Sequence, residues 1–335
     1  MNRHEKMKAV ALIDPFKSVD QRFEIDTNVD DEFNYLGVKN VAQVPKSLIE
    51  KLEKTGHYGL HTLDKSSHGG RAIDLNLINP ITGKFMSGSS SGTAINVFLA
   101  INDIGIGADG GGSVLAPAMA LNLFGFISPL IESDYMSTFS KRSTDNIQFS
   151  PSLGFITHSF TKMMEIISGT LEINVSADQI KAVISSEDLH NYDFPVQHIH
   201  FPDIYGERLP LIEFLSKELP KFDVLISYEG PVDLHGFGDS VFGHFDEETQ
   251  LLQRAACKGL IRVVNMANAT ALCIPDKGLA KGFVLISESS NEKISKMIRL
   301  ASSLITEEDE LITRYFRNLD LYFNEKYDQD EEDLK

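Results

Sequence analysis

The stretch that decides the fold runs from Ser87 to Pro117 and reads SGSSSGTAINVFLAINDIGIGADGGGSVLAP. It contains two loops of small residues, at 87–92 and 107–113. An apolar run at 94–101 lies between them. This order of loop, apolar run and loop predicts two turns that are connected by buried secondary structure.

A helix over 93–100 and a returning strand near 103–107 would bring both loops to one edge of a sheet. The lengths allow this, since a helix rises about 1.5 Å per residue and a strand about 3.3 Å. Ser89 and Ser113 would then lie close together, beside a run of backbone N–H groups. Two hydroxyls in that position make a candidate reactive site.

The composition is that of an ordinary globular protein, with 42% hydrophobic and 24% charged residues in a chain of 335. The formal net charge of −17 argues against nucleic acid or an anionic membrane as a partner, since both require clustered Lys and Arg. The N-terminus has no apolar signal segment, and no run approaches the ~18 apolar residues of a membrane span. Cys257 and Cys273 make no disulfide framework. We therefore expect a cytoplasmic protein with no membrane contact.

Strand and helix patterns alternate along the chain. Apolar runs that end at turn signals predict strands at 9–13, 58–63, 224–227, 271–274 and 283–287. Apolar spacing predicts helices that begin at Pro45 and that cover 118–126, 160–167, 212–219 and 294–305. The segment 17–41 is polar and is predicted to be irregular. The alternation predicts an α/β fold with a mixed sheet covered by helices on both faces, in one domain at 1–327 followed by an acidic tail at 328–335.

The glycine-rich sequence GIGADGGGS, which ends at Ser113, has competing interpretations. A phosphate-binding loop is excluded because no Lys-Ser or Lys-Thr follows the glycines, and the spacing does not fit a dinucleotide fingerprint. The segment could be a tight turn whose glycines allow positive φ. Alternatively, successive N–H groups could form an oxyanion hole that stabilises charge on an attacked carbonyl: those of Gly110, Gly111, Gly112 and Ser113.

The two loops together resemble the amidase signature family. SGSSSGTA followed at this separation by GADGGGSVLAPA is similar to that family's Gly-Gly-Ser-Ser-Gly-Gly loop and its Gly-Thr-Asp-Thr-Gly-Gly-Ser-Ile-Arg-x-Pro-Ala segment. A weaker similarity continues through VPKSLIEKLEKTGHYGLHTLDKS before these loops and GFITHSFTKMMEIISG after them. The resemblance implies the amidase signature fold, acyl transfer on a small-molecule or peptide amide, and no cofactor or metal.

The resemblance also implies roles for individual residues. Ser113 matches the nucleophile, and Ser89 matches the bridging serine, which follows a cis peptide bond in the family. Gly110 to Gly112 match the oxyanion loop, Asp109 matches the aspartate that supports it, and Ser90 is a further candidate for contact with the substrate. A serine hydroxyl needs a neighbouring proton acceptor to attack well, and in the family a lysine begins the proton relay.

The family lysine has no match at the position that the resemblance implies. It stands at the end of the first core strand, typically before Asp-Asn, and the first predicted strand, in KAVALIDPFK, offers Ile13 or Asp14 instead. Asp14 could accept a proton if its ionised form were stabilised in a dry site. The alternatives are lysines that would reach in from loops: Lys17, Lys65 and Lys84. The identity of the base stays open.

Two further departures from the family pattern bear on function. Leu115 stands in place of the family's arginine, so Asp109 loses an expected ion pair. The helical N-terminal segment common in the family is missing, which predicts a homo-oligomer or a protein partner. Two hypotheses remain: a divergent amide or ester hydrolase or amidotransferase-like enzyme, or a catalytically degenerate relative that acts as a binding or scaffold subunit for a partner protein.

Outside these motifs the sequence is less specific. His198 and His200 could form a metal site with Asp203, but no clear further ligand stands nearby, and surface histidines are more common. The loops at 132–150 and 230–243 are expected to set the substrate specificity.

Overall fold

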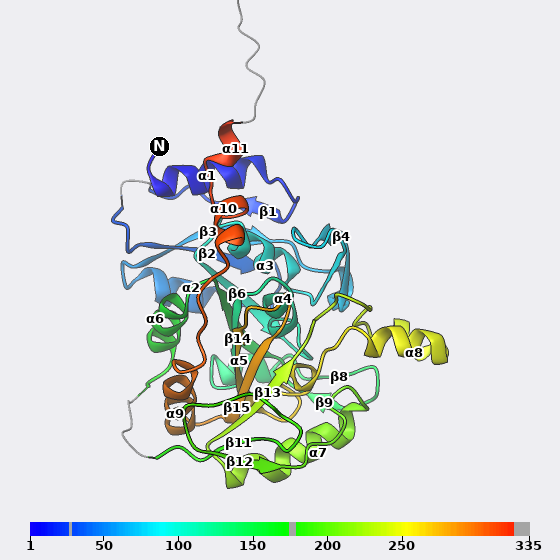
Figure 1. The fold of residues 1–335 in the computed structure, drawn as a ribbon. Helices are drawn as coiled ribbons and strands as arrows, with labels where there is room; N and C mark the ends of the chain where they lie inside the picture. The colour runs from blue at the N-terminus through cyan, green and yellow to red at the C-terminus, as the bar shows by residue number, and fades with distance from the viewer. Residues whose placement is uncertain (27–28, 174–178, 325–335) are drawn as a thin grey trace, which may run out of the picture.

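The computed structural model describes residues 1–26, 29–173 and 179–324, so the predicted tail at 328–335 lies outside the described part. The strands of the main sheet are β1 (Val19–Arg22), β2 (Asn34–Lys39), β3 (Tyr58–Asp64), β6 (Ile104–Asp109), β7 (Phe124–Ser128), β10 (Ser152–Thr157), β11 (Ala182–Ser185), β12 (Val196–Ile199), β13 (Val224–Glu229), β14 (Ala269–Pro275) and β15 (Gly282–Glu288). They form one 11-stranded sheet in the order β1-β3-β2-β6-β10-β7-β14-β15-β13-β11-β12 (Figure 1). Two small antiparallel pairs lie outside it: β4 (Ile73–Ile78) with β5 (Phe85–Ser87), and β8 (Lys141–Arg142) with β9 (Gln148–Phe149).

The described helices are α1 (Arg3–Ile13), α2 (Lys46–Glu53), α3 (Ser91–Phe98), α4 (Leu115–Ala120), α5 (Ser133–Ser137), α6 (Phe160–Thr170), α7 (Arg208–Glu218), α8 (Glu247–Arg254), α9 (Asn291–Ala301), α10 (Glu310–Tyr315) and α11 (Leu321–Asn324). None of these is long and apolar enough to span a membrane.

Two hydrophobic cores lie on the two faces of the sheet. Strand β15 shows why, because alternate residues point to opposite faces: Phe283 and Leu285 join one core, and Val284 and Ile286 join the other. Helices α1, α3, α4 and α7 contribute to the first core, and α2, α5, α6 and α9 to the second (Figure 1). Parallel pairs such as β2 with β6 stand beside antiparallel pairs such as β6 with β10. The predicted mixed sheet with helices on both faces is therefore confirmed.

The predicted strand at 9–13 is wrong, because these residues form the end of helix α1. Asn2 and Glu5 form a capping box at its start, and Met7, Val10 and Ala11 are buried at helical spacing. The apolar run at 9–13 is too short to show helical spacing by itself. The spacing is visible only when the earlier turns of the helix, from Arg3 onward, are included.

The segment 17–41 is not irregular, since it contains strands β1 and β2. All six residues of β2 are buried, among them the polar Asn34 and Lys39 at its ends. A strand that is covered on both faces shows no alternation of apolar and polar residues, which is why the pattern was missed. The first core strand is therefore β2, and it lies parallel to β6.

The predicted helix at 118–126 is also wrong, because the run divides into the end of α4 and the start of β7. Asn122 has a left-handed backbone (φ 52°) between the two elements, where a helix cannot continue. The predicted strands at 58–63, 224–227, 271–274 and 283–287 are confirmed as β3, β13, β14 and β15.

Two glycines of β6 position the serine loops. A Cβ on Gly105 would lie 2.4 Å from Thr93 Cγ2, and one on Gly107 would lie 2.7 Å from Ser90 Oγ. Both distances are too short for real Cβ atoms, so only glycine allows α3 to pack this closely on the strand. The loop before α3 is thereby held against the strand that leads to Ser113.

Candidate active site

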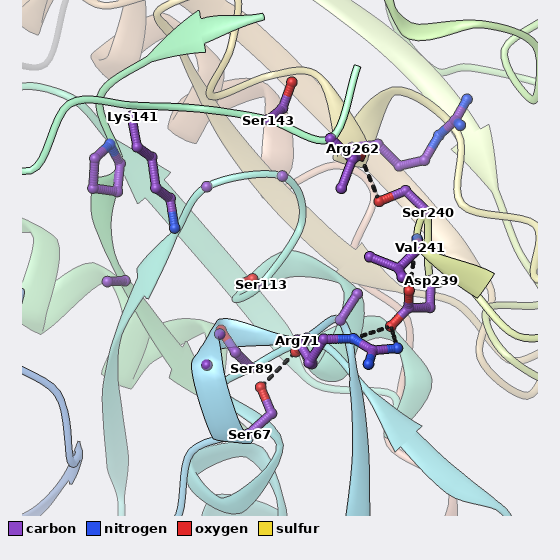
Figure 2. A pocket seen from close by; sticks show the side chains of 18 of the residues that line it. Ser67, Arg71, Ser89, Ser113, Lys141, Ser143, Asp239, Ser240, Val241 and Arg262 are labelled. Carbon is purple, nitrogen blue, oxygen red and sulfur yellow. Dashed lines mark hydrogen bonds and ion pairs between the residues drawn. The ribbon is translucent and has the colours of Figure 1, made fainter. Parts of the chain in front are cut away.

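The two serine loops meet at one end of β6. Ser89 precedes α3, and Ser113 lies between β6 and α4. The Ser90 N–H donates to the Ser113 carbonyl oxygen at 3.1 Å, which ties the loops together. Ser89 and Ser113 line the same cavity of about 450 Å³ (Figure 2). The structure therefore brings together the two hydroxyls that the sequence singled out.

The sequence prediction missed Lys39, which lies beside these serines. Its Nζ donates to Ser89 Oγ at 2.6 Å and to the Ala108 carbonyl oxygen at 3.1 Å. Lys39 is the last residue of β2, and the parallel pairing of β2 with β6 directs it to the same sheet edge. The signal in the sequence was a lysine at the end of the buried run Tyr-Leu-Gly-Val, followed by Asn40. This is the place that the resemblance gives to the family lysine, once β2 is recognised as the first core strand.

Burial lowers the pKa of Lys39. The neutral amine, which is the form that accepts a proton, is therefore available near pH 7, where an ordinary lysine is almost fully protonated. Only 4% of the residue's surface is exposed. Removal from water lowers the pKa of Lys39 from 10.5 to about 7, against the opposing attraction of Asp109 and with a further small decrease from Lys141. Near pH 7 a large fraction of Lys39 is thus the neutral amine, which can accept a proton from Ser89.

Asp109 shapes the loop that follows β6. Its carboxylate accepts hydrogen bonds from the N–H groups of Gly112 at 2.7 Å, Val114 at 2.6 Å and Leu115 at 3.3 Å. Complete burial raises the pKa of Asp109, while these bonds and the charge of Lys39 oppose the rise. The side chain of Leu115 lies in the core, so backbone donors take the place of the arginine that the resemblance implies for Asp109.

One of the four predicted oxyanion donors, the Gly112 N–H, already has a hydrogen-bond partner in the structure. The N–H of Gly112 is already bonded to Asp109, so Gly112 is corrected from an oxyanion donor to a structural residue. Its φ of +93° favours glycine, and a Cβ would lie only 3.2 Å from the Ile261 carbonyl oxygen, which is a tight contact. The N–H groups of Gly110, Gly111 and Ser113 donate to no other described residue, and all three residues line the cavity.

Ser90 and Asp14 lie outside the cavity. Ser90 is fully buried, its hydroxyl packs against Gly107, and no described residue bonds to it. Asp14 ends α1, and its carboxylate accepts the N–H groups of Ser18 at 2.8 Å and Val19 at 3.4 Å. Ser90 is thus not placed to contact a substrate, and Asp14 is not placed to act as the base.

The other candidates are also accounted for. None of the lysines at 17, 65 and 84 lines the cavity, and Lys84 Nζ instead donates to the Leu234 carbonyl oxygen at 2.5 Å. His198 and His200 are exposed at the sheet edge. The described residues contain no group of three or more His, Cys, Asp or Glu that could hold a metal ion. Within the same part of the chain, the cis peptide bond is Gly230–Pro231, so the bond before Ser89 is trans, contrary to the expectation from the resemblance.

Three solved structures show what this arrangement is similar to. A glutamyl-tRNA(Gln) amidotransferase subunit from Thermotoga maritima superposes with a TM-score of 0.64 at 14% identity, covering 91% of this chain and 93% of that one. An amidase gives a TM-score of 0.59 at 13% identity, with 90% and 95% covered. A 6-aminohexanoate cyclic dimer hydrolase, solved with its substrate, gives 0.56 at 12% identity, with 91% and 94% covered. The fold is that of the amidase signature family.

The structural matches confirm the amidase signature fold that the resemblance of the two serine loops implied. No family model matches the sequence, and neither does any curated protein. In this chain Lys39, Ser89 and Ser113 lie at the same end of the central strands. Lys39 is the last residue of β2, Ser89 lies in the loop before α3, and Ser113 lies in the loop after β6. The loops at 132–150 and 230–243 contribute residues to the cavity wall, among them Lys141, Phe149 and Asp239.

Proposed function

We propose that this chain is a serine-dependent acyl-transfer enzyme that acts on an amide or ester, with Ser113 as nucleophile, Ser89 as proton relay and Lys39 as base. The hydrogen bond from Lys39 Nζ to Ser89 Oγ is the observation that carries the proposal. It joins a group that can be neutral near pH 7 to a hydroxyl in the cavity of Ser113. The similarity in fold to an amidase and to a component of an amidotransferase supports the same class of chemistry.

The reaction would begin with neutral Lys39. The amine takes the proton of the Ser89 hydroxyl while Ser89 takes the proton of Ser113, and Ser113 Oγ forms a bond to the substrate carbonyl carbon. The carbonyl oxygen becomes an oxyanion, which accepts hydrogen bonds from the backbone donors of Gly110, Gly111 and Ser113. These groups sit in a fixed loop, because Asp109 binds the neighbouring N–H groups.

Collapse of this intermediate breaks the bond between the carbonyl carbon and the leaving amine or alcohol. The proton held by Lys39 returns through Ser89 to the leaving group. The acyl group stays on Ser113 until water or another amine attacks it by the same route in reverse. Water as acceptor gives a hydrolase, and an amine gives a transferase.

The alternative is a catalytically degenerate protein that uses the cleft to bind a partner. One argument for that alternative is the lack of a lysine at the expected position, and the contact of Lys39 with Ser89 supports the enzyme instead. Labelling with a fluorophosphonate probe separates the two functions. We expect the native chain to react and Ser113→Ala not to react. A folded native chain that stays unlabelled between about pH 6 and 10 would contradict the enzyme proposal.

A further inference from the structure

The cavity around Ser113 has a charge opposite to that of the rest of the protein. The whole chain has 31 Lys and Arg residues against 48 Asp and Glu. Among the described residues, the cavity wall holds a single carboxylate, Asp239, and these basic side chains: Lys39, Arg71, Lys141, Arg142, Arg208, Lys258 and Arg262. A cavity with such a lining attracts anions.

Three of these cations already have a carboxylate partner in the protein: Arg71, Lys258 and Arg208, the last paired with Asp145. Arg71 donates two hydrogen bonds to one oxygen of Asp239, Oδ2, at 3.0 Å from Nε and 2.8 Å from Nη2. Lys258 is buried beside Asp233, with 3.6 Å between Nζ and the carboxylate. None of these three charges lacks a counter-charge.

Lys141 is different, because no described carboxylate pairs with it. Its Nζ lies 5.8 Å from the centre of the Phe149 ring, and its Cε lies 3.9 Å from the place of a Cβ on Gly110. Figure 2 shows its side chain reaching from the β8 side toward the loop that carries Ser113. Lys141 is also close enough to Lys39 to help lower the pKa of that lysine.

A second donor lies on the other side of the same loop. Arg208 binds Asp145 through Nε at 2.7 Å and also through Nη2, which leaves Nη1 without a described acceptor. That Nη1 lies 3.8 Å from the place of a Cβ on Gly111. Arg262 lies close by and donates only to backbone carbonyl oxygens, at 2.8 to 3.2 Å. Unlike the charge of Arg208, its charge has no carboxylate partner among the described residues. The repulsion between Arg208 and Arg262 lowers the pKa of Arg262, after the larger effect of burial.

We propose that the substrate carries a carboxylate close to its reactive carbonyl, a proposal that rests on the proposed function. Lys141 and Arg208, on the two sides of the Gly110–Gly111 loop, bind this carboxylate. The same loop holds the oxyanion donors, so the carboxylate and the reactive carbonyl must be only a few bonds apart. Monoamides of short dicarboxylic acids fit this requirement. A neutral amide of equal length would leave the Lys141 ammonium and Nη1 of Arg208 without an acceptor, and a cationic amide would be repelled.

Binding to Ser113→Ala tests this proposal without turnover. Isothermal titration compares succinamate with butyramide, which has a methyl group in place of the carboxylate. We expect succinamate to bind at least about tenfold more tightly, since hydrogen bonds to charged groups are the strong ones. Adding Lys141→Met should weaken succinamate about tenfold and leave butyramide unchanged, and Lys141→Arg should restore most of the loss. Lys51→Met, an exposed lysine on α2, is the matched control.

The outcomes separate this proposal from the proposed function. Equal affinity for the two amides, or an affinity for succinamate that is unchanged by both Lys141→Met and Arg208→Met, would overturn the carboxylate proposal. If the native chain is nevertheless labelled at Ser113 by the fluorophosphonate, the enzyme proposal stands. Preferential binding of succinamate without labelling would instead support the carboxylate site and refute the catalytic role.

Discussion

Lys39 offers the most informative perturbation, because its burial connects activity with stability. The fall of its pKa from 10.5 to about 7 corresponds to about 5 kcal/mol, at about 1.4 kcal/mol per pKa unit. Between these two pH values the unfolded chain binds a proton that the native chain has lost. The free energy of unfolding therefore rises with pH across this window, by about 1.4 kcal/mol per pH unit from this one group. Below about pH 7 both states are protonated and the contribution to the slope disappears.

Lys39→Met removes the titrating group and keeps the length of the side chain. We expect the difference in unfolding free energy between native chain and variant to change by about 3 kcal/mol over two pH units above neutrality, in favour of the native chain as pH rises. The rate of fluorophosphonate labelling by the native chain should rise with pH, with a midpoint near 7, because the relay needs the neutral amine. The variant should label at least about a hundredfold more slowly.

Urea denaturation at a series of pH values and labelling kinetics at the same values provide both measurements. Lys51→Met is again the control, because that lysine is exposed and should alter neither profile. Parallel stability curves for the native chain and Lys39→Met would refute the reasoning, since Lys39 would then titrate alike in both states. A labelling midpoint near the ordinary lysine value would refute it equally.

Three other predictions concern the remaining parts of the site. Ser113→Ala should lower the rate of turnover at least about a thousandfold, while the midpoint of thermal unfolding stays nearly unchanged. Ser89→Ala should lower the rate of turnover about a hundredfold. Turnover retained in Ser113→Ala would exclude that serine as nucleophile. Gly107→Ala should cost about 1–3 kcal/mol in urea denaturation, because its Cβ would lie 2.7 Å from Ser90 Oγ, whereas the control Gly169→Ala on α6 has no atom within 3.8 Å of its Cβ and should be neutral or slightly stabilising. Asp14→Asn should leave the labelling rate within about twofold and cost about 1 kcal/mol through the weakened bonds to Ser18 and Val19, and a large loss of labelling would restore Asp14 as a candidate base.

The loop prediction succeeded because its evidence is local. Small residues around Ser89 and before Ser113 have few uses other than tight turns and close backbone approach. The glycines of β6 are needed where α3 packs on that strand, and both features stand within one short stretch of sequence. Burial of the long apolar runs on both faces of a sheet follows from the hydrophobic effect in the same direct way.

Local sequence patterns could not identify Lys39 as the candidate base. Lys39 and Ser89 are far apart in sequence, and their contact depends on β2 lying parallel to β6. A strand that is buried on both faces has no alternating apolar and polar pattern, so the sequence does not mark β2 as a strand. The family's first core strand is then matched to residues 9–13, which belong to helix α1. A lysine also has no intrinsic mark of a lowered pKa, because the shift arises only when folding removes it from water.

By itself, the sequence determined the α/β class, the two serine loops and the glycine turn that joins β6 to α4. Only the tertiary structure decided which N–H groups remain for an oxyanion, because Asp109 occupies that of Gly112. It alone also decided which cations surround Ser113, since Lys141 and Arg208 come from separate parts of the chain. The physical reason is that turns and periodic burial depend on neighbours in sequence, whereas desolvation and charge pairing depend on neighbours in space.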